Sequence, residues 1–388
     1  MTLLYRFLIP AILIALPAAA AEKRAFTIED LYRLKGLQHL ALSPDGSRLA
    51  FEVSSQDLKA AKRSTQIWLL EVATGSAKQL TSSGKADTEP QWSKDGKTLF
   101  FLSNREGGSQ LWALDPSGGE ARKVTTFEAG IGSPKLLPGG SKVVFEASVF
   151  PEAMADGAKQ KELSEKLESG PVQAHLADSL LYRHWTEWQD FQYSHLFVAT
   201  FEGPVEAITS GKQDYPADAT TPMPQSFDVS PDGKEICVVT NTDPVPARST
   251  NQDLFLIRLD GDHTPQRITD NPAYDGEPKY SPDGRFIAYR SFAANLLPVS
   301  NRNGAPNVFL YDRLNRTTML ASASRLDGGT ADNRSRTPSF SPDGHTLFFA
   351  SWASDLAAQD FNQSGDVFAL PFLYVTVLPG SAPGTTTE

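Results

Sequence analysis

The sequence predicts an all-β fold, a β-propeller built from four-stranded blades. The first observation is a tetrapeptide, Ser-Pro-Asp-Gly, which recurs along most of the 388 residues. The second is a run of β-branched, aliphatic and aromatic residues shortly after each copy, a composition that β-strands favour. The third is the interval between copies, because a repeat of roughly 40 to 50 residues is typical of a propeller blade. Six blades are recognisable, and the sequence leaves room for a seventh.

The recurring tetrapeptide has the chemistry of a tight hairpin turn. Proline at its second position presets φ for a type I turn, aspartate tolerates the third position, and glycine accepts a positive φ at the fourth. We therefore expect Gly284 and its equivalents to have φ > 0 and to join the first two strands of a blade. Intact copies stand at residues 43–46, 230–233, 281–284 and 341–344, and degenerate copies at 93–96 and 137–140.

The other strands of each unit follow the turn in a fixed order. A strand-like run comes first, at 49–53, 99–102, 143–145, 236–239, 286–289 and 347–349. A second run follows, at 66–72, 110–114, 195–200, 253–259, 307–311 and 366–370. Four units then add a short run that ends in threonine, at 77–81, 121–125, 207–209 and 266–269. The alternative, six unrelated hairpins in a β-sandwich, does not explain this regular order.

One step of the repeat is too long for a single blade. The turns are 50, 44, 93, 51 and 60 residues apart, and the pattern stops between residues 151 and 193. We expect a small helical insertion in the third blade, with a helix over 158–169 and helical spacing of apolar residues over 176–188. The insertion also holds the candidate ligand-binding residues Tyr182, Arg183, His184, Trp185, Glu187 and Trp188.

These aromatic and charged side chains allow two interpretations. Placed over one propeller face, with Trp185 and Trp188 at its opening, they would bind a peptide or a sugar. Alternatively, the aromatic rings pack the insertion onto its own blade.

The two ends of the chain differ in composition from the repeats. Residues 1–21 have a basic Arg6, an apolar stretch and small residues at the end, which predicts a secretory signal peptide. We therefore expect export to a bacterial periplasm or the outside, with no membrane span after cleavage. The propeller would occupy residues 22–378, and 379–388 would form a flexible tail. The single cysteine, Cys237, cannot form an internal disulfide and is expected to be a small buried hydrophobic residue.

Composition and missing motifs exclude several functions. The formal net charge of −10 argues against nucleic acid and anionic membrane surfaces as partners. The sequence has no Gly-x-Ser-x-Gly, His-Glu-x-x-His or Cys-x-x-Cys motif and no phosphate-binding glycine loop. We therefore predict no catalytic residue, no metal and no cofactor. Asp360, Asn362 and Asp366 faintly resemble a calcium loop, but an Asx-rich turn is the ordinary account.

Several segments resemble the N-terminal propeller of the prolyl oligopeptidase family. They are residues 26–31 (Phe-Thr-Ile-Glu-Asp-Leu), 181–188 (Leu-Tyr-Arg-His-Trp-Thr-Glu-Trp), 227–233 and 274–291. The branch they resemble most is that of dipeptidyl peptidase V and acylaminoacyl-peptidase. After residue 291 the units resemble TolB-type, WD40-like repeats instead. In that family the propeller caps an α/β-hydrolase domain with a Ser-Asp-His triad, and this sequence has no matching motif onto which a catalytic residue could be carried.

The resemblance leaves two main functional hypotheses. In the first, the chain is an exported, non-catalytic propeller that binds a peptide or protein partner or acts as a scaffold. In the second, it is the substrate-gating propeller of a serine peptidase whose hydrolase domain is missing or separate. A third reading, an enzyme acting on sugars in the channel, would need clustered carboxylates with raised pKa values. The oligomeric state stays open.

Overall fold

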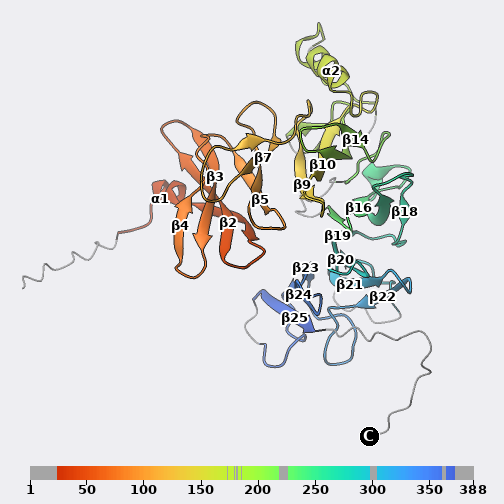
Figure 1. Ribbon diagram of the computed structural model, residues 1–388. Coiled ribbons are helices and arrows are strands. Elements are labelled where there is room, and N and C mark those ends of the chain that lie inside the picture. The colour runs from red at the N-terminus through yellow and green to blue at the C-terminus, as the bar shows by residue number, and fades with distance from the viewer. Residues whose placement is uncertain are drawn as a thin grey trace, which may run out of the picture.

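The computed structural model describes residues 24–172, 174–178, 180, 182–184, 186–217, 226–297, 304–360 and 364–371. It is a six-bladed β-propeller of antiparallel sheets (Figure 1). The predicted fold class is confirmed, with six blades and not seven. Within the described ranges no helix is long and apolar enough to cross a membrane. The expected signal peptide at 1–21 and the tail at 379–388 lie outside the described residues.

Five blades have four described strands and the sixth has three. Blades 1 and 2 contain β1 (Gly36–Leu42), β2 (Arg48–Asp57), β3 (Lys62–Glu71), β4 (Ser76–Gln79), β5 (Asp87–Trp92), β6 (Leu99–Ser103), β7 (Gln110–Leu114) and β8 (Arg122–Lys123). Blades 3 and 4 contain β9 (Gly132–Leu136), β10 (Lys142–Val149), β13 (Tyr193–Thr200), β14 (Val205–Ala207), β15 (Phe227–Val229), β16 (Glu235–Thr240), β17 (Asp253–Arg258) and β18 (Gln266–Arg267). Blades 5 and 6 contain β19 (Asp275–Tyr280), β20 (Phe286–Ser291), β21 (Asn307–Asp312), β22 (Thr317–Leu320), β23 (Ser335–Phe340), β24 (Thr346–Ser351) and β25 (Asp366–Pro371).

The turn between the first two strands of each blade has the predicted geometry. Gly284 has φ 73°, and its N–H donates to the Ser281 carbonyl oxygen at 2.8 Å. The turn aspartate also has a role that the sequence analysis did not assign. Asp283 accepts the Ser281 hydroxyl at 2.6 Å and the Arg285 N–H at 3.1 Å, which fixes the turn from both sides. All six turn glycines have positive φ: Gly46, Gly96, Gly140, Gly233, Gly284 and Gly344.

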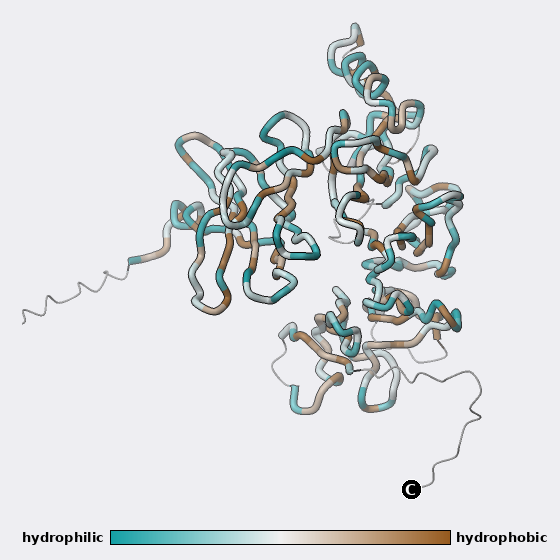
Figure 2. Tube along the Cα trace, in the orientation of Figure 1, coloured by the Kyte–Doolittle hydropathy of each residue, from teal (hydrophilic) through white to brown (hydrophobic). Residues whose placement is uncertain are grey.

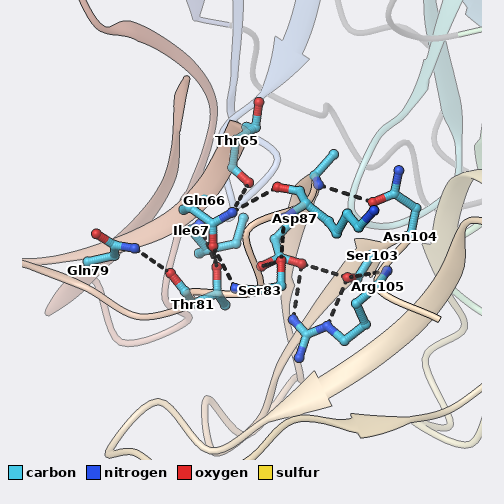
Figure 3. Close-up of polar contacts among 12 residues, drawn as sticks. Thr65, Gln66, Ile67, Gln79, Thr81, Ser83, Asp87, Ser103, Asn104 and Arg105 are labelled. Atoms are coloured by element: carbon cyan, nitrogen blue, oxygen red, sulfur yellow. Dashed lines mark hydrogen bonds and ion pairs between the residues drawn. The ribbon is translucent and has the colours of Figure 1, made fainter. Parts of the chain in front are cut away.

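A second repeated contact joins the outer strands of blades 1 to 5. In blade 2 the Thr125 hydroxyl accepts the Leu111 N–H at 2.9 Å and donates to Gln110 Oε1 at 3.0 Å. Thr81 does the same in blade 1, where Figure 3 shows it beside Gln66. The equivalent hydroxyls in blades 3, 4 and 5 are those of Thr209, Thr269 and Ser322. The threonine at the end of each predicted fourth strand therefore holds that end to the third strand through hydrogen bonds.

The hydrophobic core lies between successive blades rather than at one centre. Phe101 of blade 2 packs against Leu69 of blade 1, and Phe145 of blade 3 packs with residues of blade 2. The hydrophobic stretches of the chain fall largely on the strands (Figure 2). Cys237 is fully buried in the cluster between blades 4 and 5, as expected, and burial raises the pKa of its thiol.

Blades 1 and 6, the first and the last along the chain, each have a face with exposed apolar side chains. β25 pairs only with β24 among the described residues, so blade 6 has no described fourth strand. Residues 373–378, which could supply it, lie outside the described ranges. Val367 on β25 is exposed, as are Leu37, Leu40 and Leu42 on β1. Apolar side chains that would pack against a neighbouring blade elsewhere in the ring are therefore in contact with solvent at these two faces.

The insertion is partly as predicted. The expected helix is α2 (Gly157–Ser169), which begins after Asp156 and stands beyond blade 3 (Figure 1). The helical spacing over 176–188 was misleading, because the described residues there form a two-stranded pair, β11 (Arg183–His184) and β12 (Glu187–Trp188). Leu176 and Leu180 are exposed, so these two apolar positions are not part of a packed helical face. Without a packed face, a short helix is not stabilised in water. The other described helical turns are α1 (Ile28–Arg33) and the 3₁₀ turn Pro246–Arg248.

Candidate functional site

A cavity of about 710 Å³ opens between the first strands of blades 1 to 4. In each of these blades the first strand is the end strand of its sheet, so one of its edges faces away from the other strands. Ionisable residues from each of the four blades line the cavity: His39, Glu89, Lys135 and Asp228. Pro44 and Lys94 also line it, which places the cavity toward the end of the ring that carries the hairpin turns.

The first strands share a bulge that sequence reasoning missed. Strand pairing shifts register at this point in five blades, and one residue there has a positive φ. A non-glycine residue in this conformation is uncommon, and a bulge redirects a side chain out of the regular pleat. The five residues are His39, Glu89, Ser133, Glu277 and Thr337. Each lies six positions before the third residue of its turn, so the fixed offset was a signal that could have located them.

On one wall of the cavity, a buried carboxylate holds two bulge residues. Glu52 on β2 is almost fully buried, and its Oε1 lies 2.7 Å from His39 Nδ1. The same oxygen accepts the backbone N–H of Glu89 at 2.6 Å. The hydrogen bond to Glu52 raises the pKa of His39, while burial raises the pKa of Glu89. This wall therefore combines a histidine that gains a proton easily with a carboxyl group that holds its proton longer than usual.

Two lysines lie near the cavity: Lys135 lines it, and Lys279 pairs with the lining residue Asp228. Lys279 Nζ lies 3.1 Å from Asp228 Oδ1, and Asp228 Oδ2 accepts the Tyr280 N–H at 2.9 Å. Burial lowers the pKa of Lys135, and the nearby charge of Lys279 lowers it further. Asp228 is already paired with Lys279 and with the Tyr280 N–H. Lys135, which lines the cavity itself, is therefore better placed than Lys279 to bind an anion. The cavity thus offers an acidic group and a basic group to one ligand.

The insertion brings together only some of the predicted site residues. Tyr182 and Trp188 are 43% and 40% exposed, with ring centroids 5.8 Å apart. Arg183 Cζ lies 5.3 Å from the centre of the Trp188 ring. His184 and Glu187 belong to β11 and β12, but their side chains, like the whole of Trp185, lie outside what the structure describes.

Two residues that the sequence analysis did not select complete this cluster. The His175 ring stacks on Trp188 at 4.1 Å, and His175 Nδ1 lies 2.7 Å from Asp190 Oδ1.

The insertion joins β10 to β13, so it leaves blade 3 at the end opposite the hairpin turns. It is therefore separate from the cavity, and none of its described residues lines the cavity wall. Asn362, one of the three residues that resemble a calcium loop, lies outside the described residues. Within those residues no group of three or more His, Cys, Asp or Glu is arranged to hold a metal.

Comparisons with known proteins agree with this architecture. A family described as the TolB beta propeller domain matches residues 34–174. The matched residues span blades 1 and 2 and the first two strands of blade 3. Dipeptidyl-peptidase 5 of Porphyromonas gingivalis is 30% identical over an alignment of 286 residues, which covers 71% of this chain and 40% of that protein. Dipeptidyl-peptidase 5 of Porphyromonas endodontalis is 27% identical over an alignment of 304 residues, which covers 73% of this chain and 42% of that protein.

A solved structure supports the fold alone. The acylaminoacyl peptidase of Pyrococcus horikoshii superposes with a TM-score of 0.59 at 14% sequence identity, over 88% of this chain and 45% of that protein. The chain is therefore similar in sequence to dipeptidyl-peptidase 5, and it shares the propeller fold with the acylaminoacyl peptidase. The chain spans about two-fifths of the length of the dipeptidyl-peptidase 5 relatives named above.

Proposed function

We propose that this TolB-type propeller is an exported, non-catalytic module that binds peptides in its channel. The observation that carries the proposal is the cavity, which is lined by Glu89, His39 and Lys135. A volume of about 710 Å³ falls within the range of ordinary small-ligand sites. A short peptide has the matching groups, since it carries an ammonium, a carboxylate and a row of amides.

The backbone around the cavity adds a second reason for a peptide. The first strand of each blade has one edge without a strand partner in its own sheet. Such edges offer N–H and C=O groups to an extended chain, while side-chain pockets supply selectivity. A sugar could hydrogen-bond to the carboxylates, but it has no backbone amides to pair with the N–H and C=O groups of the strand edges.

A second candidate is the substrate-gating propeller of a peptidase in the prolyl oligopeptidase family. It is favoured by the coverage of the dipeptidyl-peptidase 5 relatives, of which this chain matches 40% and 42%. In this case the hydrolase part would be a separate polypeptide or another segment of the protein. Both candidates require a peptide to enter the cavity. In the first candidate the propeller itself binds the peptide, and in the second the peptide passes on to a hydrolase.

The test is calorimetric titration of the purified protein with a set of short unblocked peptides. Glu89→Gln and Lys135→Gln should each weaken binding by about tenfold, since each removes one charge that contacts the ligand. Lys142→Gln, an exposed lysine of the same blade as Lys135, is the matched control and should leave binding unchanged. Failure of the peptides to bind, or equal binding by all three variants, would overturn the proposal.

A further inference from the structure

Blade 6 carries two arginines that share one indole ring. Arg334 precedes β23, Arg336 lies in β23, and Trp352 directly follows β24. Arg334 Cζ lies 4.2 Å and Arg336 Cζ 4.7 Å from the centre of the Trp352 ring. Cations at this distance are attracted to the ring face, which limits their freedom and keeps them in place. We call Arg334, Arg336 and Trp352 the arginine–indole site.

The charges of this site are not neutralised within the described part of the chain. Both arginines are exposed, and neither has an ion pair there, whereas Arg285 and Arg313 each pair with a carboxylate. Their Cζ atoms are at most about 9 Å apart, which is close to one Debye length at physiological ionic strength. Two like charges at this separation repel each other, so an anion bound between them would be stabilised.

Nearby carboxylates in the same loops are already engaged. Asp355 Oδ1 accepts the Asp332 N–H at 3.0 Å. Asp332 in turn accepts the Ser354 N–H at 2.8 Å and the Ser354 hydroxyl at 2.6 Å. These bonds hold the two loops together and direct both carboxylates toward backbone and hydroxyl donors.

Blade 5 shows how the chain neutralises a similar group internally. There Arg290 lies 5.0 Å from the Tyr274 ring centre and 5.4 Å from that of Phe292. Glu277 lies 3.1 Å from Arg290, and the arginine side chain is only 8% exposed.

The aligned positions of blade 6 carry different side chains, and none is the carboxylate of Glu277. The turns of the two blades are 60 residues apart, so Trp352 corresponds to Phe292 and Arg334 to Tyr274. Position 337, which corresponds to Glu277, is a threonine whose N–H donates to Glu277 Oε2 at 2.8 Å. Blade 6 therefore also places arginine beside an aromatic ring, but at other positions, because Ala350 corresponds to Arg290 and Thr337 to Glu277.

We propose that the arginine–indole site binds a carboxylate group of a peptide. A guanidinium group can donate to both oxygens of a carboxylate, and the indole ring limits the freedom of the two arginines before the ligand binds. The carboxylate can be that of a chain end or of an acidic side chain. None of the three residues lines the channel cavity, so this inference does not rest on the proposed channel function.

The test uses the full chain labelled with 5-fluorotryptophan and ¹⁹F NMR, with the Trp352 resonance assigned from Trp352→Phe. The probes are N-acetylated tetra-alanine with a free carboxylate, the same peptide amidated, and an amidated peptide with one internal glutamate. The free-carboxylate peptide should shift the Trp352 resonance saturably, and the amidated peptide without glutamate should not. A shift with the internal-glutamate peptide also supports the proposal and identifies a side chain as a second source of the carboxylate.

Variants separate specific recognition from simple charge attraction. Arg334→Gln with Arg336→Gln should abolish the shift, and Arg334→Lys with Arg336→Lys should weaken binding about tenfold, because lysine keeps the charge but not the fork of donors. Arg325→Gln, an exposed arginine of the neighbouring loop, is the control and should bind as the parent does. The proposal is wrong if the amidated alanine peptide binds equally well, if no probe moves the Trp352 resonance, or if the shift survives the double glutamine variant. The amidated-peptide comparison needs only the Trp352→Phe spectrum for assignment, so it decides the question even if an arginine variant fails to fold.

Discussion

At the scale of single residues, the turn glycines give the sharpest stability prediction. Gly284 has φ 73°, and an added Cβ would meet Pro231 Cδ at an ordinary 3.5 Å, so the cost of a side chain is backbone strain. Gly284→Val should lower the free energy of unfolding by about 1–3 kcal/mol, measured by urea denaturation. Gly139→Ala is the control, because an added Cβ there meets nothing within 4 Å and φ is not positive. Equal effects of the two substitutions would refute the strain argument.

His39 provides a pH-dependent prediction at the same scale. Its folded-state pKa is raised, chiefly by the hydrogen bond to Glu52. A raised pKa means that the stabilisation is fully present below the unfolded pKa of about 6.5 and is lost as pH rises through the higher folded value. His39→Asn should therefore cost more stability at pH 5.5 than at pH 8.5, as seen in urea unfolding at both values. Asparagine tolerates the positive φ of this position, so backbone strain does not confuse the comparison. A pH-independent difference would contradict the His39–Glu52 interaction.

At the scale of elements, the insertion should be dispensable for folding. Val149 pairs with Tyr193, so the ends of β10 and β13 already lie opposite each other where the insertion begins. Replacing residues 154–190 with a short Gly-Ser linker should shift the melting temperature by only a few degrees, because each blade packs mainly on its neighbours. Loss of cooperative melting would show instead that α2 and the β11–β12 pair support blade 3. The ligand-binding role of Tyr182, Arg183 and Trp188 stays a prediction.

The elements also show what the sequence could and could not reveal. The turns and the strands after them were predictable, because proline, aspartate and glycine act locally. Helix α2 was predictable from its good helix-forming residues. The β11–β12 pair was not, since apolar spacing over 176–188 says nothing about whether a surface exists to bury it. The bulges at His39 and Glu89 were also missed, because a positive φ at a non-glycine residue depends on contacts outside its own strand, such as those of both residues with Glu52 on β2.

At the scale of the whole molecule, the blades form a ring with one unsupported junction among the described residues. Five inter-blade clusters bury the core, while the outer faces of blades 1 and 6 expose leucine and valine side chains. The cavity lies between the first strands of blades 1 to 4. Its blade 1 wall includes Leu40 and Leu42, which are exposed, while the strands of blades 2 to 4 that line it pack on both neighbouring blades.

Hydrogen–deuterium exchange with and without a bound short peptide tests the central claim, peptide binding in the channel, most directly. The account predicts slower exchange of backbone amides in β1, β5, β9 and β15, which surround the cavity, and no change in the described part of 176–191. Protection confined to the insertion, or no protection of the four first strands by a peptide that binds, would contradict it.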